Sequence, residues 1–281
     1  MKKKCYYFFL LLIGFQFSAL ATEPFRFVLL SDLHISNTNP QPSLDLANAV
    51  ADVNKLSGID FVIVAGDIAN LGDTVSLRLA KQMLQRLYIP FFVIPGNHDV
   101  KWYENGTTNF KAIFGENKFE FRHKGIEFIG FTTAPLTNSG LGTIQQDDIL
   151  WMKKILEKTD PKMPVIVITH YPLQTGDVDN WKEMIVVLNK YNVHAVLGGH
   201  VHRNVLFNYE GIPGIISRST LRGKDPVGGY SIFSISDSIR VYEKKSGKPE
   251  EKWLTLPFEY KNQLNTNAVN DYSLKKNKSF E

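Results

Sequence analysis

Short apolar runs alternate with longer amphipathic segments along most of this chain, a pattern typical of strands and helices built around a largely buried sheet. The clearest strands are expected at residues 25–30, 61–65, 91–94, 165–169 and 195–197. Helical spacing between them predicts helices capped by Ser43, by Asp73 and by Thr143 with its partner Gln146, the second of them running to about Leu87. The pattern therefore favours an α/β fold.

The pattern of apolar and polar residues changes after Gly199. Short strand-like pieces separated by Gly, Pro and Asn follow at residues 205–209, 212–217, 230–235 and 239–242, which predicts that an antiparallel section closes the fold. Residues 261–281 are rich in Asn, Lys and Ser and show little apolar periodicity, so we expect a disordered tail there. One domain is expected at residues 22–260.

The N-terminus has the pattern of an export signal. Three lysines at positions 2–4 precede an apolar run from Tyr6 to Phe17, and Ala19-Leu20-Ala21 follows with small residues where a signal peptidase cleaves. We expect residues 1–21 to be a cleaved signal peptide and the protein to be periplasmic or secreted. The alternative is an uncleaved anchor, but the run is shorter than the roughly 20 residues that span a bilayer, so no membrane span is expected in the mature chain.

Composition excludes several classes of protein. A hydrophobic fraction of 43% with 21% charged residues describes a globular chain with a core. Removing the three N-terminal lysines lowers the formal net charge by three, from +4 to +1, so nothing implies a nucleic-acid partner. The one cysteine, Cys5, lies in the export segment, which excludes disulfides and a cysteine nucleophile in the mature protein.

Five polar clusters each follow a predicted strand. They are Ser-Asp-Leu-His at 31–34, Ala-Gly-Asp at 65–67, Pro-Gly-Asn-His-Asp at 95–99, Thr-His-Tyr at 169–171 and Gly-Gly-His-Val-His at 198–202. Side chains that follow strands gather at the carboxyl edge of an α/β sheet. The candidate site residues are therefore Asp32, His34, Asp67, Asn97, His98, Asp99, His170, His200 and His202.

These residue types suit divalent cations. Carboxylate oxygen and imidazole nitrogen bind such ions, and a carboxylate can bridge two of them about 3.5 to 4 Å apart. Alternation along an extended segment would aim Asp32 with His34, and His200 with His202, into one pocket. A single cluster is more often a cap or turn, but a fold has no packing reason to bury so many imidazoles and carboxylates together without cations.

The order Asp-x-His, Gly-Asp, Gly-Asn-His-Asp, His, Gly-His-x-His resembles the calcineurin-like metallophosphoesterases, over the segment from Asp32 to His202. The resemblance implies a four-layer α/β sandwich in which two mixed β-sheets are flanked by helices. It also implies two divalent metal ions, which mixed nitrogen and oxygen ligands allow to be Mn, Fe or Zn.

The resemblance further implies a role for each residue. Asp32, His34 and His202 would bind one metal, Asn97, His170 and His200 the other, and Asp67 would bridge them. A metal-bridging hydroxide would attack the phosphate ester, with His98 as general acid or charge stabiliser and Asp99 orienting it. The expected activity is thus that of a metal-dependent phosphoesterase acting on a small-molecule or lipid-linked phosphate ester.

The motif pattern looks closer to the class III cyclic nucleotide phosphodiesterase group and its bacterial relatives than to the purple acid phosphatase branch. Asn70 stands where the purple acid phosphatase branch has tyrosine, and His34 where that branch has glycine. Phosphodiesters are therefore favoured as substrates, with monoesters or pyrophosphates as the alternative on the same site. A non-catalytic metal-binding scaffold is a further alternative, and a nuclease is less favoured because a basic groove is missing.

Residues outside the motifs give weaker evidence of function. Trp102 and Tyr103 follow the third cluster and either stack on a nucleobase or pack against the protein, and packing is the commoner role. His123 and His194 have no partner motif and are expected to be core or surface residues. No role is predicted for Arg218 or Arg222.

Overall fold

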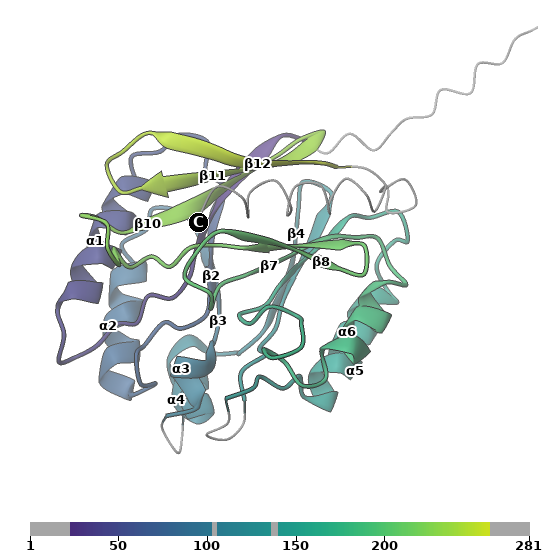
Figure 1. The fold of residues 1–281 in the computed structure, drawn as a ribbon, viewed down its shortest axis with the longest axis horizontal. Coiled ribbons are helices and arrows are strands. Elements are labelled where there is room, and N and C mark those ends of the chain that lie inside the picture. The colour runs from purple at the N-terminus through teal and green to yellow at the C-terminus, as the bar shows by residue number, and fades with distance from the viewer. Residues whose placement is uncertain (1–22, 103–105, 136–139, 259–281) are drawn as a thin grey trace, which may run out of the picture.

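The computed structural model describes residues 23–102, 106–135 and 140–258. The predicted signal peptide and tail, at 1–21 and 261–281, lie outside these residues. Two six-stranded sheets lie face to face with helices on both outer sides (Figure 1). The four-layer sandwich expected from the motif pattern is therefore confirmed.

The first sheet has the order β12-β11-β10-β1-β2-β3. Its parallel half is made of β1 (Phe25–Leu30), β2 (Phe61–Ala65) and β3 (Phe91–Ile94). Its antiparallel half is made of β10 (Gly229–Ile235), β11 (Ser238–Lys245) and β12 (Glu250–Pro257), with β10 beside β1. The last strands of the chain therefore complete the sheet that the first strands begin.

The second sheet has the order β4-β5-β6-β7-β9-β8. Its strands are β4 (Phe119–His123), β5 (Ile126–Gly130), β6 (Val165–Ile168), β7 (Val193–Gly198), β8 (Val205–Tyr209) and β9 (Ile212–Ile216). The edge strands β4 and β8 are antiparallel to their neighbours, whereas β9 runs parallel to β7. The prediction of an antiparallel closing section is thus right for β10 to β12 and wrong for β9.

The helices cover the outer faces. Three of them, α1 (Gln41–Val53), α2 (Thr74–Leu84) and α4 (Gly106–Phe114), pack on the first sheet, while α5 (Gln146–Leu156) and α6 (Trp181–Leu188) pack on the second. The short α3 (Asn97–Val100) begins directly after β3. In the described residues, no helix is long and apolar enough to cross a membrane.

Alternation along the central strands explains the layering. On β1, Val28 and Leu30 face the helices, whereas Phe27 and Leu29 face the other sheet. The core between the sheets contains a cluster of phenylalanine rings among aliphatic side chains: the ring of Phe27 stacks on Phe61 at 5.1 Å and on Phe233 at 4.9 Å between centroids. This packing fixes the two sheets against each other and so fixes where their strand ends meet.

Helix starts were predicted with mixed success. The carboxylate of Asp73 accepts a hydrogen bond from the Ser76 amide, as expected of a cap, and α2 ends at Leu84. The caps predicted at Ser43 and Thr143 are wrong, because α1 begins after Pro40 and α5 after Gln145. The Thr143 hydroxyl instead donates to Asp179.

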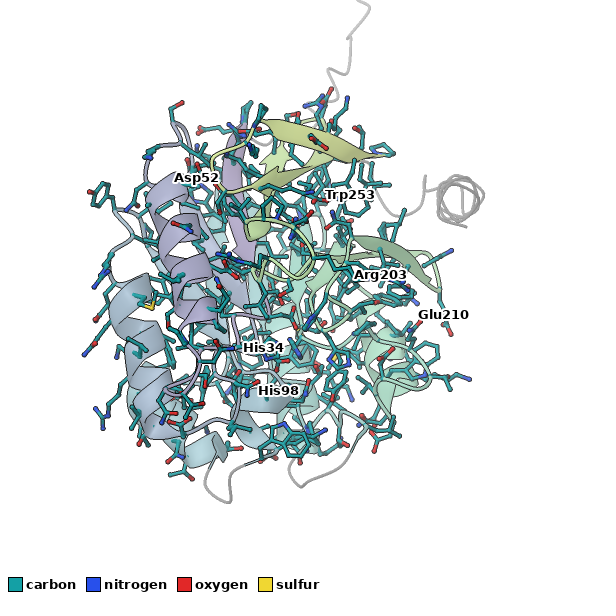
Figure 2. All side chains as sticks on the ribbon, turned by 60° about the vertical axis from the view of Figure 1, so that its left-hand side comes forward. His34, Asp52, His98, Arg203, Glu210 and Trp253 are labelled. Atoms are coloured by element: carbon teal, nitrogen blue, oxygen red, sulfur yellow. The ribbon has the colours of Figure 1, made fainter. Side chains whose placement is uncertain are left out.

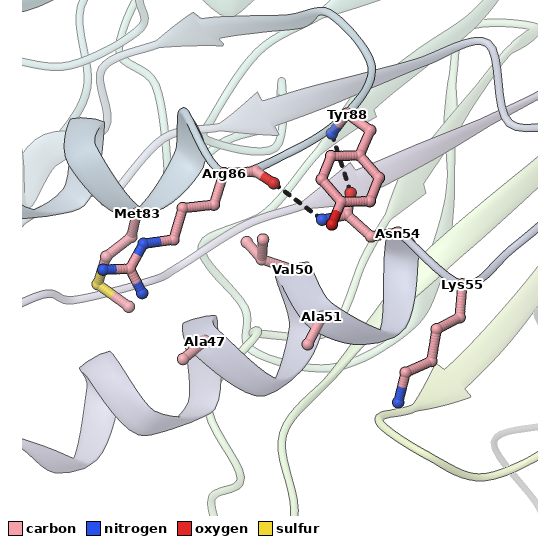
Figure 3. Close-up of a pocket in the computed structure, with 8 residues that line it drawn as sticks. All are labelled: Ala47, Val50, Ala51, Asn54, Lys55, Met83, Arg86 and Tyr88. Atoms are coloured by element: carbon pink, nitrogen blue, oxygen red, sulfur yellow. Dashed lines mark hydrogen bonds between the residues drawn. The ribbon is translucent and has the colours of Figure 1, made fainter.

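A shallow groove of about 620 Å³ lies between the ends of α1 and α2 (Figure 3). Asn54 closes one end of it, donating from Nδ2 to the Arg86 carbonyl at 2.8 Å and accepting from the Tyr88 amide at 3.0 Å. This side chain ties the end of α1 to the turn that leads into β3. It therefore helps to fix the helical layer on the first sheet.

The inter-sheet core allows a first prediction. Phe27→Ala should lower the free energy of unfolding by about 3 to 5 kcal/mol, because a fully buried ring between two stacked neighbours leaves a cavity. Urea denaturation of the two proteins in the same buffer measures it. Leu44→Ala, at a helix position exposed by 55%, is the matched control and should stay within about 0.5 kcal/mol. A loss at Phe27 no larger than that of the control would contradict this account of the core.

Candidate metal centre and active site

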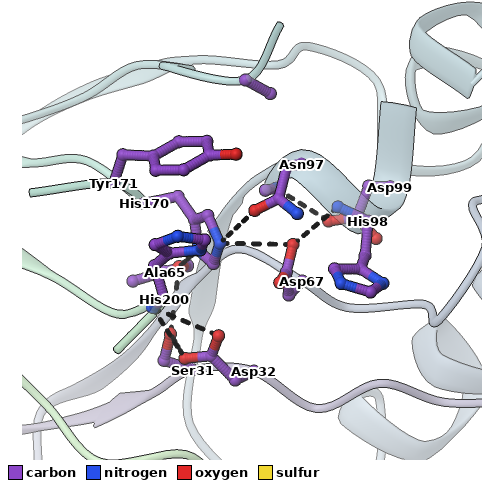
Figure 4. A network of polar contacts seen from close by, with 12 residues as sticks. Ser31, Asp32, Ala65, Asp67, Asn97, His98, Asp99, His170, Tyr171 and His200 are labelled. Carbon is purple, nitrogen blue, oxygen red and sulfur yellow. Dashed lines mark hydrogen bonds and ion pairs between the residues drawn. The ribbon is translucent and has the colours of Figure 1, made fainter. Parts of the chain in front are cut away.

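The polar clusters meet where β1, β2 and β3 of one sheet and β6 and β7 of the other end. His34 and His98 lie at this edge of the molecule (Figure 2), and a closer view shows the carboxylates and imidazoles pointing toward one another (Figure 4). Backbone hydrogen bonds hold adjacent loops together: the Asp32 amide donates to the Gly66 carbonyl and the His34 amide to the Asp67 carbonyl. The structure thus brings residues from both sheets into one site.

The backbone at this edge is unusual. Among the described residues, seven non-glycine residues have positive φ, and five of them are Asp32, His34, Asp67, His200 and His202. The prediction that extended alternation aims these pairs is therefore wrong, although their side chains do converge. Each residue instead bends the chain in the left-handed region, where Asp and His are more often tolerated than most residues.

The carboxylate of Asp67 lies at the centre of the site, only 1% exposed. Its Oδ1 lies 3.2 Å from His170 Nε2 and accepts a hydrogen bond from the His98 amide at 2.8 Å. Its Oδ2 lies 3.7 Å from His34 Nε2. The two oxygens therefore face different histidines, the arrangement required of a carboxylate shared by two ions.

The Asp32 carboxylate forms the first flank. Its Oδ1 lies 3.1 Å from His202 Nε2, and the His200 amide donates to both carboxylate oxygens. His202 Nε2 also lies 3.2 Å from His34 Nε2. Asp32, His34 and His202 thus present one ligand atom each, within 4.8 Å of one another.

Asn97, His170 and His200 form the second flank. The Nδ1 of His170 lies 2.7 Å from the Ala65 carbonyl, so it carries the proton and leaves Nε2 free to face Asn97 Oδ1 at 3.1 Å. Asp67, His170 and His200 also bring ligand atoms within 4.8 Å of one another. A backbone carbonyl behind a histidine is the usual support of a metal-binding imidazole.

Electrostatics follow from this crowding. Burial alone would raise the pKa of Asp67, but the imidazoles of His170 and His34 hold it below its usual range. Burial opposes the charged form of His170, yet the Asp67 carboxylate raises its pKa to about 9. Burial and the charge on His170 lower the pKa of His200 to about 4. The Asp67 carboxylate therefore stabilises positively charged groups beside it, of which the protonated His170 ring is one.

His98 is held differently from the expectation. Its Nδ1 lies 2.7 Å from the Asn70 carbonyl, which can only accept, so this bond leaves Nε2 for a bound group. The Asp99 carboxylate instead accepts from the backbone amides of Gly96, Ile68 and Ala69. The ring of His98 is thus held by the Asn70 carbonyl, while Asp99 contributes to the placement of His98 by tying the loops after β2 and β3 together.

The environment of Asp99 also affects its charge. Burial and the neighbouring Asp67 carboxylate raise the pKa of Asp99 to about 7, although three amide donors favour its ionised form. The side chain is fully buried. It therefore acts on the loops and does not reach a ligand.

Two residues at the site were missed from the sequence. Asp177, in the loop after β6, places Oδ1 3.9 Å from His200 Nε2, and the Tyr171 ring lies 4.0 Å from the His200 ring between centroids. Tyr171 directly follows His170, which was a usable signal. Asp177 does not come directly after a strand but lies far along the loop between β6 and α6, so the strand-end rule could not find it.

Two glycines make the close approach possible. A Cβ at Gly96 would collide with the Asp67 carboxylate and would lie 2.8 Å from His170 Nε2. A Cβ at Gly199 would collide with the Ser31 hydroxyl and would lie 2.6 Å from Asp32 Oδ2. Only glycine fits between the loops at these positions.

The donor set fits divalent cations. Buried carboxylates and imidazoles with their nitrogen atoms turned toward one another are costly unless protons or cations neutralise them. A third close group, His34, Asp67 and His98, overlaps the other two. The described residues would therefore hold metal on both sides of Asp67.

The remaining singled-out residues lie elsewhere. His123 pairs with Asp60 at 2.7 Å, and the His194 ring stacks on Phe258. Arg218 pairs with Glu243 and Arg222 with Asp45, both at 2.8 Å. Trp102 is exposed by 46%, with its ring centroid 6.1 Å from that of His98, and Tyr103 lies outside the described residues.

Curated relatives match this chain at low identity. A probable glycerophosphodiester phosphodiesterase of Arcobacter nitrofigilis is 31% identical over 61% of this chain, and the match spans 60% of that protein. Probable cyclic nucleotide phosphodiesterases of Vesicomyosocius okutanii and Coxiella burnetii are each 25% identical, over 70% and 76% of this chain and 86% and 87% of their own.

Solved structures share the fold. The purple acid phosphatase of yellow lupin seeds matches with a TM-score of 0.60 at 12% identity, over 84% of this chain and 53% of its own. The anchor protein of the Plasmodium inner membrane complex matches with a TM-score of 0.61 at 15% identity, over 89% and 93%. The model of the calcineurin-like phosphoesterase family matches residues 25–204. This chain therefore belongs to the calcineurin-like phosphoesterases, a family of phosphoric ester hydrolases.

Proposed function

We propose that the protein is a phosphodiesterase that uses two divalent metal ions, of Mn, Fe or Zn. The observation that carries the proposal is the Asp67 carboxylate, whose two oxygens face His170 and His34 from opposite flanks of the site. On this proposal Asp32, His34 and His202 hold one ion, Asn97, His170 and His200 hold the other, and Asp67 is shared. Seven ligands on rigid strand ends favour this arrangement.

The metal ions and the protein side chains would supply different parts of the reaction. When bound, two divalent cations supply a water acidic enough to attack near neutral pH and neutralise charge on the phosphate. His98 supplies the proton that the leaving alcohol needs, from Nε2, while its Nδ1 stays bonded to the Asn70 carbonyl. Asp99 keeps the loop of His98 against the loop of Asp67 through its three amide bonds.

A diester is favoured over a monoester. The relatives quoted above are named as phosphodiesterases, of glycerophosphodiesters or of cyclic nucleotides. The hollow beside His34 and His98 is lined, among the described residues, by no Lys or Arg, so apart from its histidines it offers no cationic side chain to the second negative charge of a monoester. Asp177 adds a carboxylate on the other flank, which also disfavours a dianion.

A direct assay tests the proposal. The protein loaded with Mn²⁺ should hydrolyse bis(4-nitrophenyl) phosphate with a higher kcat/KM than 4-nitrophenyl phosphate, because the diester carries one charge. Released nitrophenolate gives both rates. Two bound ions with no turnover of either ester would support a scaffold, and a preference for the monoester would contradict the diester proposal.

Replacing His98 tests whether this residue donates a proton without being needed to hold the metal ions. His98→Ala should keep both ions and lower kcat on an alkyl diester by roughly a hundred- to ten-thousandfold, because a positioned acid is lost. The loss should be smaller on bis(4-nitrophenyl) phosphate, whose leaving group needs little protonation. Metal analysis and kinetics on both esters measure this.

Asp67→Ala is the comparison variant. It should retain fewer than two ions and lose nearly all activity, because the shared carboxylate is gone. If His98→Ala were purified without metal, or if Asp67→Ala kept two ions, the assigned roles would be wrong.

Metal uptake should depend on pH. The pKa of His170 is raised to about 9, so its ring is protonated below that pH and must lose the proton before it can bind a cation. Apparent affinity should therefore rise by about tenfold per pH unit between pH 6 and 8 for each proton released. Calorimetry with Mn²⁺ in buffers of different ionisation enthalpy counts the protons. An affinity that is flat across this range would contradict the assignment of His170 as a ligand.

A further inference from the structure

A hollow of about 440 Å³ opens beside the candidate metal centre, with His34, His98 and His202 on its inner wall. Its other described lining residues are Ser36, Thr38, Asn39, Asn70, Pro42 and Leu221. The hollow thus adjoins both one flank of the site and the ring assigned as proton donor. A group bound there would be the part of the substrate next to His98, which is the leaving alcohol.

The outer lining is neutral. Ser36 and Thr38 offer hydroxyls, Asn39 and Asn70 offer amides, and apart from the three histidines no described lining residue is charged or aromatic. A second phosphate would call for Arg or Lys, and a nucleobase would call for a stacking ring, which among the described lining residues only the three histidines already assigned to metal and proton transfer could supply. Trp102, whose ring centroid lies 6.1 Å from that of His98, does not line the hollow. The lining instead suits hydroxyl groups, which both donate and accept hydrogen bonds.

The polar groups are held in place by the backbone. The Thr38 amide donates to Ser36 Oγ at 3.2 Å, and the two hydroxyl oxygens lie 3.0 Å apart. The Gln41 amide donates to Asn39 Oδ1 at 3.0 Å, so the Asn39 amide nitrogen remains to donate to a ligand. The Asn37 amide binds Ser76 Oγ on α2, which fixes this loop to the helical layer. These bonds restrict the loop that carries the hydroxyl and amide groups and so lower the entropy cost of ordering it around a ligand.

Asn70 connects the hollow to the reaction. Its backbone carbonyl orients His98, while its side chain lines the hollow. One residue thus contacts both the proton donor and the space for the alcohol that receives the proton. Pro42 and Leu221 supply apolar surface for the carbon chain of such an alcohol.

From these contacts we infer that the hollow binds the leaving alcohol of the diester, and that this alcohol is a neutral, hydroxylated one such as a polyol or sugar. Thr38, Asn39 and Asn70 are its specificity determinants. The inference rests on the proposed phosphodiesterase activity and adds the chemical class of the leaving group.

A pair of matched substrates tests it. The Mn²⁺-loaded protein is assayed on glycerol methyl phosphate and propyl methyl phosphate, with released glycerol or propanol measured, and on 3′,5′-cyclic AMP. Glycerol methyl phosphate should have the highest kcat/KM of the three, by about tenfold or more over its propyl analogue, because unpaired polar groups penalise the missing hydroxyls.

Two variants locate the preference. Thr38→Val and Asn70→Leu keep the side-chain size and remove hydrogen bonds, and each should reduce the glycerol-to-propyl ratio of kcat/KM by about tenfold. Thr255→Val on β12 and Asn48→Leu on α1 make the same changes at residues that do not line the hollow and should leave that ratio unchanged. Because the ratio compares kcat/KM for two substrates on the same variant, it separates a change in substrate recognition from a general loss of activity.

The outcomes separate the two proposals. Turnover of bis(4-nitrophenyl) phosphate without a glycerol preference, a preference for cyclic AMP, or a ratio unchanged in both hollow variants would overturn this inference alone. No turnover of any diester with two ions bound would overturn the proposed function, and the leaving-group inference with it.

Discussion

A carboxylate that is almost entirely shielded from water must be neutralised by its surroundings, and Asp67 is the residue on which this requirement falls most heavily. Its partners come from different layers of the fold. His34 follows β1, His98 follows β3, and His170 follows β6 of the facing sheet. The two sheets therefore have to stack in one alignment for the charges to balance. The aromatic core between the sheets and the buried ionic cluster at their edge depend on the same alignment.

Catalysis and recognition occupy neighbouring parts of one loop. The segment after β1 carries Asp32 and His34 on its inner side and Ser36 and Thr38 a few residues further out. Hydrogen bonds to the loop after β2 and to Ser76 hold its two ends. If the proposed roles hold, a change in the outer residues would alter substrate choice while the inner residues keep their partners.

The sequence was informative where chemistry and periodicity agree. All nine candidate residues meet at the sheet edge or support it, because each follows a strand whose apolar run is easy to read. The hairpin of β4 and β5 was missed, although Phe119 and Phe121 alternate with polar residues and Lys124-Gly125 forms a tight turn with positive φ at both positions. The family motif drew attention to strands that carry ligands, and this hairpin carries none.

Other features were beyond any local pattern. The Asn70 carbonyl supports His98 through the backbone, which has the same chemistry in every residue. The approach of Asp177 to His200 depends on the path of a long loop. The caps at Ser43 and Thr143 failed because Pro40 and Gln145 allow the helices to begin at other residues. Tertiary geometry, rather than propensity, decided each of these.

The left-handed backbone at Asp32, His34, Asp67, His200 and His202 has an evolutionary consequence. Glycine adopts this conformation without penalty, whereas other residues lose roughly 1 to 3 kcal/mol at each such position. Only the need for a ligand side chain keeps five non-glycine residues there. In a lineage released from selection for catalysis, glycine at these positions would relieve the backbone strain, but it would also remove the stabilisation that bound ions give the folded state and the hydrogen bonds that Asp67 and Asp32 accept from the amides of His98 and His200. Glycine at several of these positions in a homologue would thus mark a site that no longer holds ions.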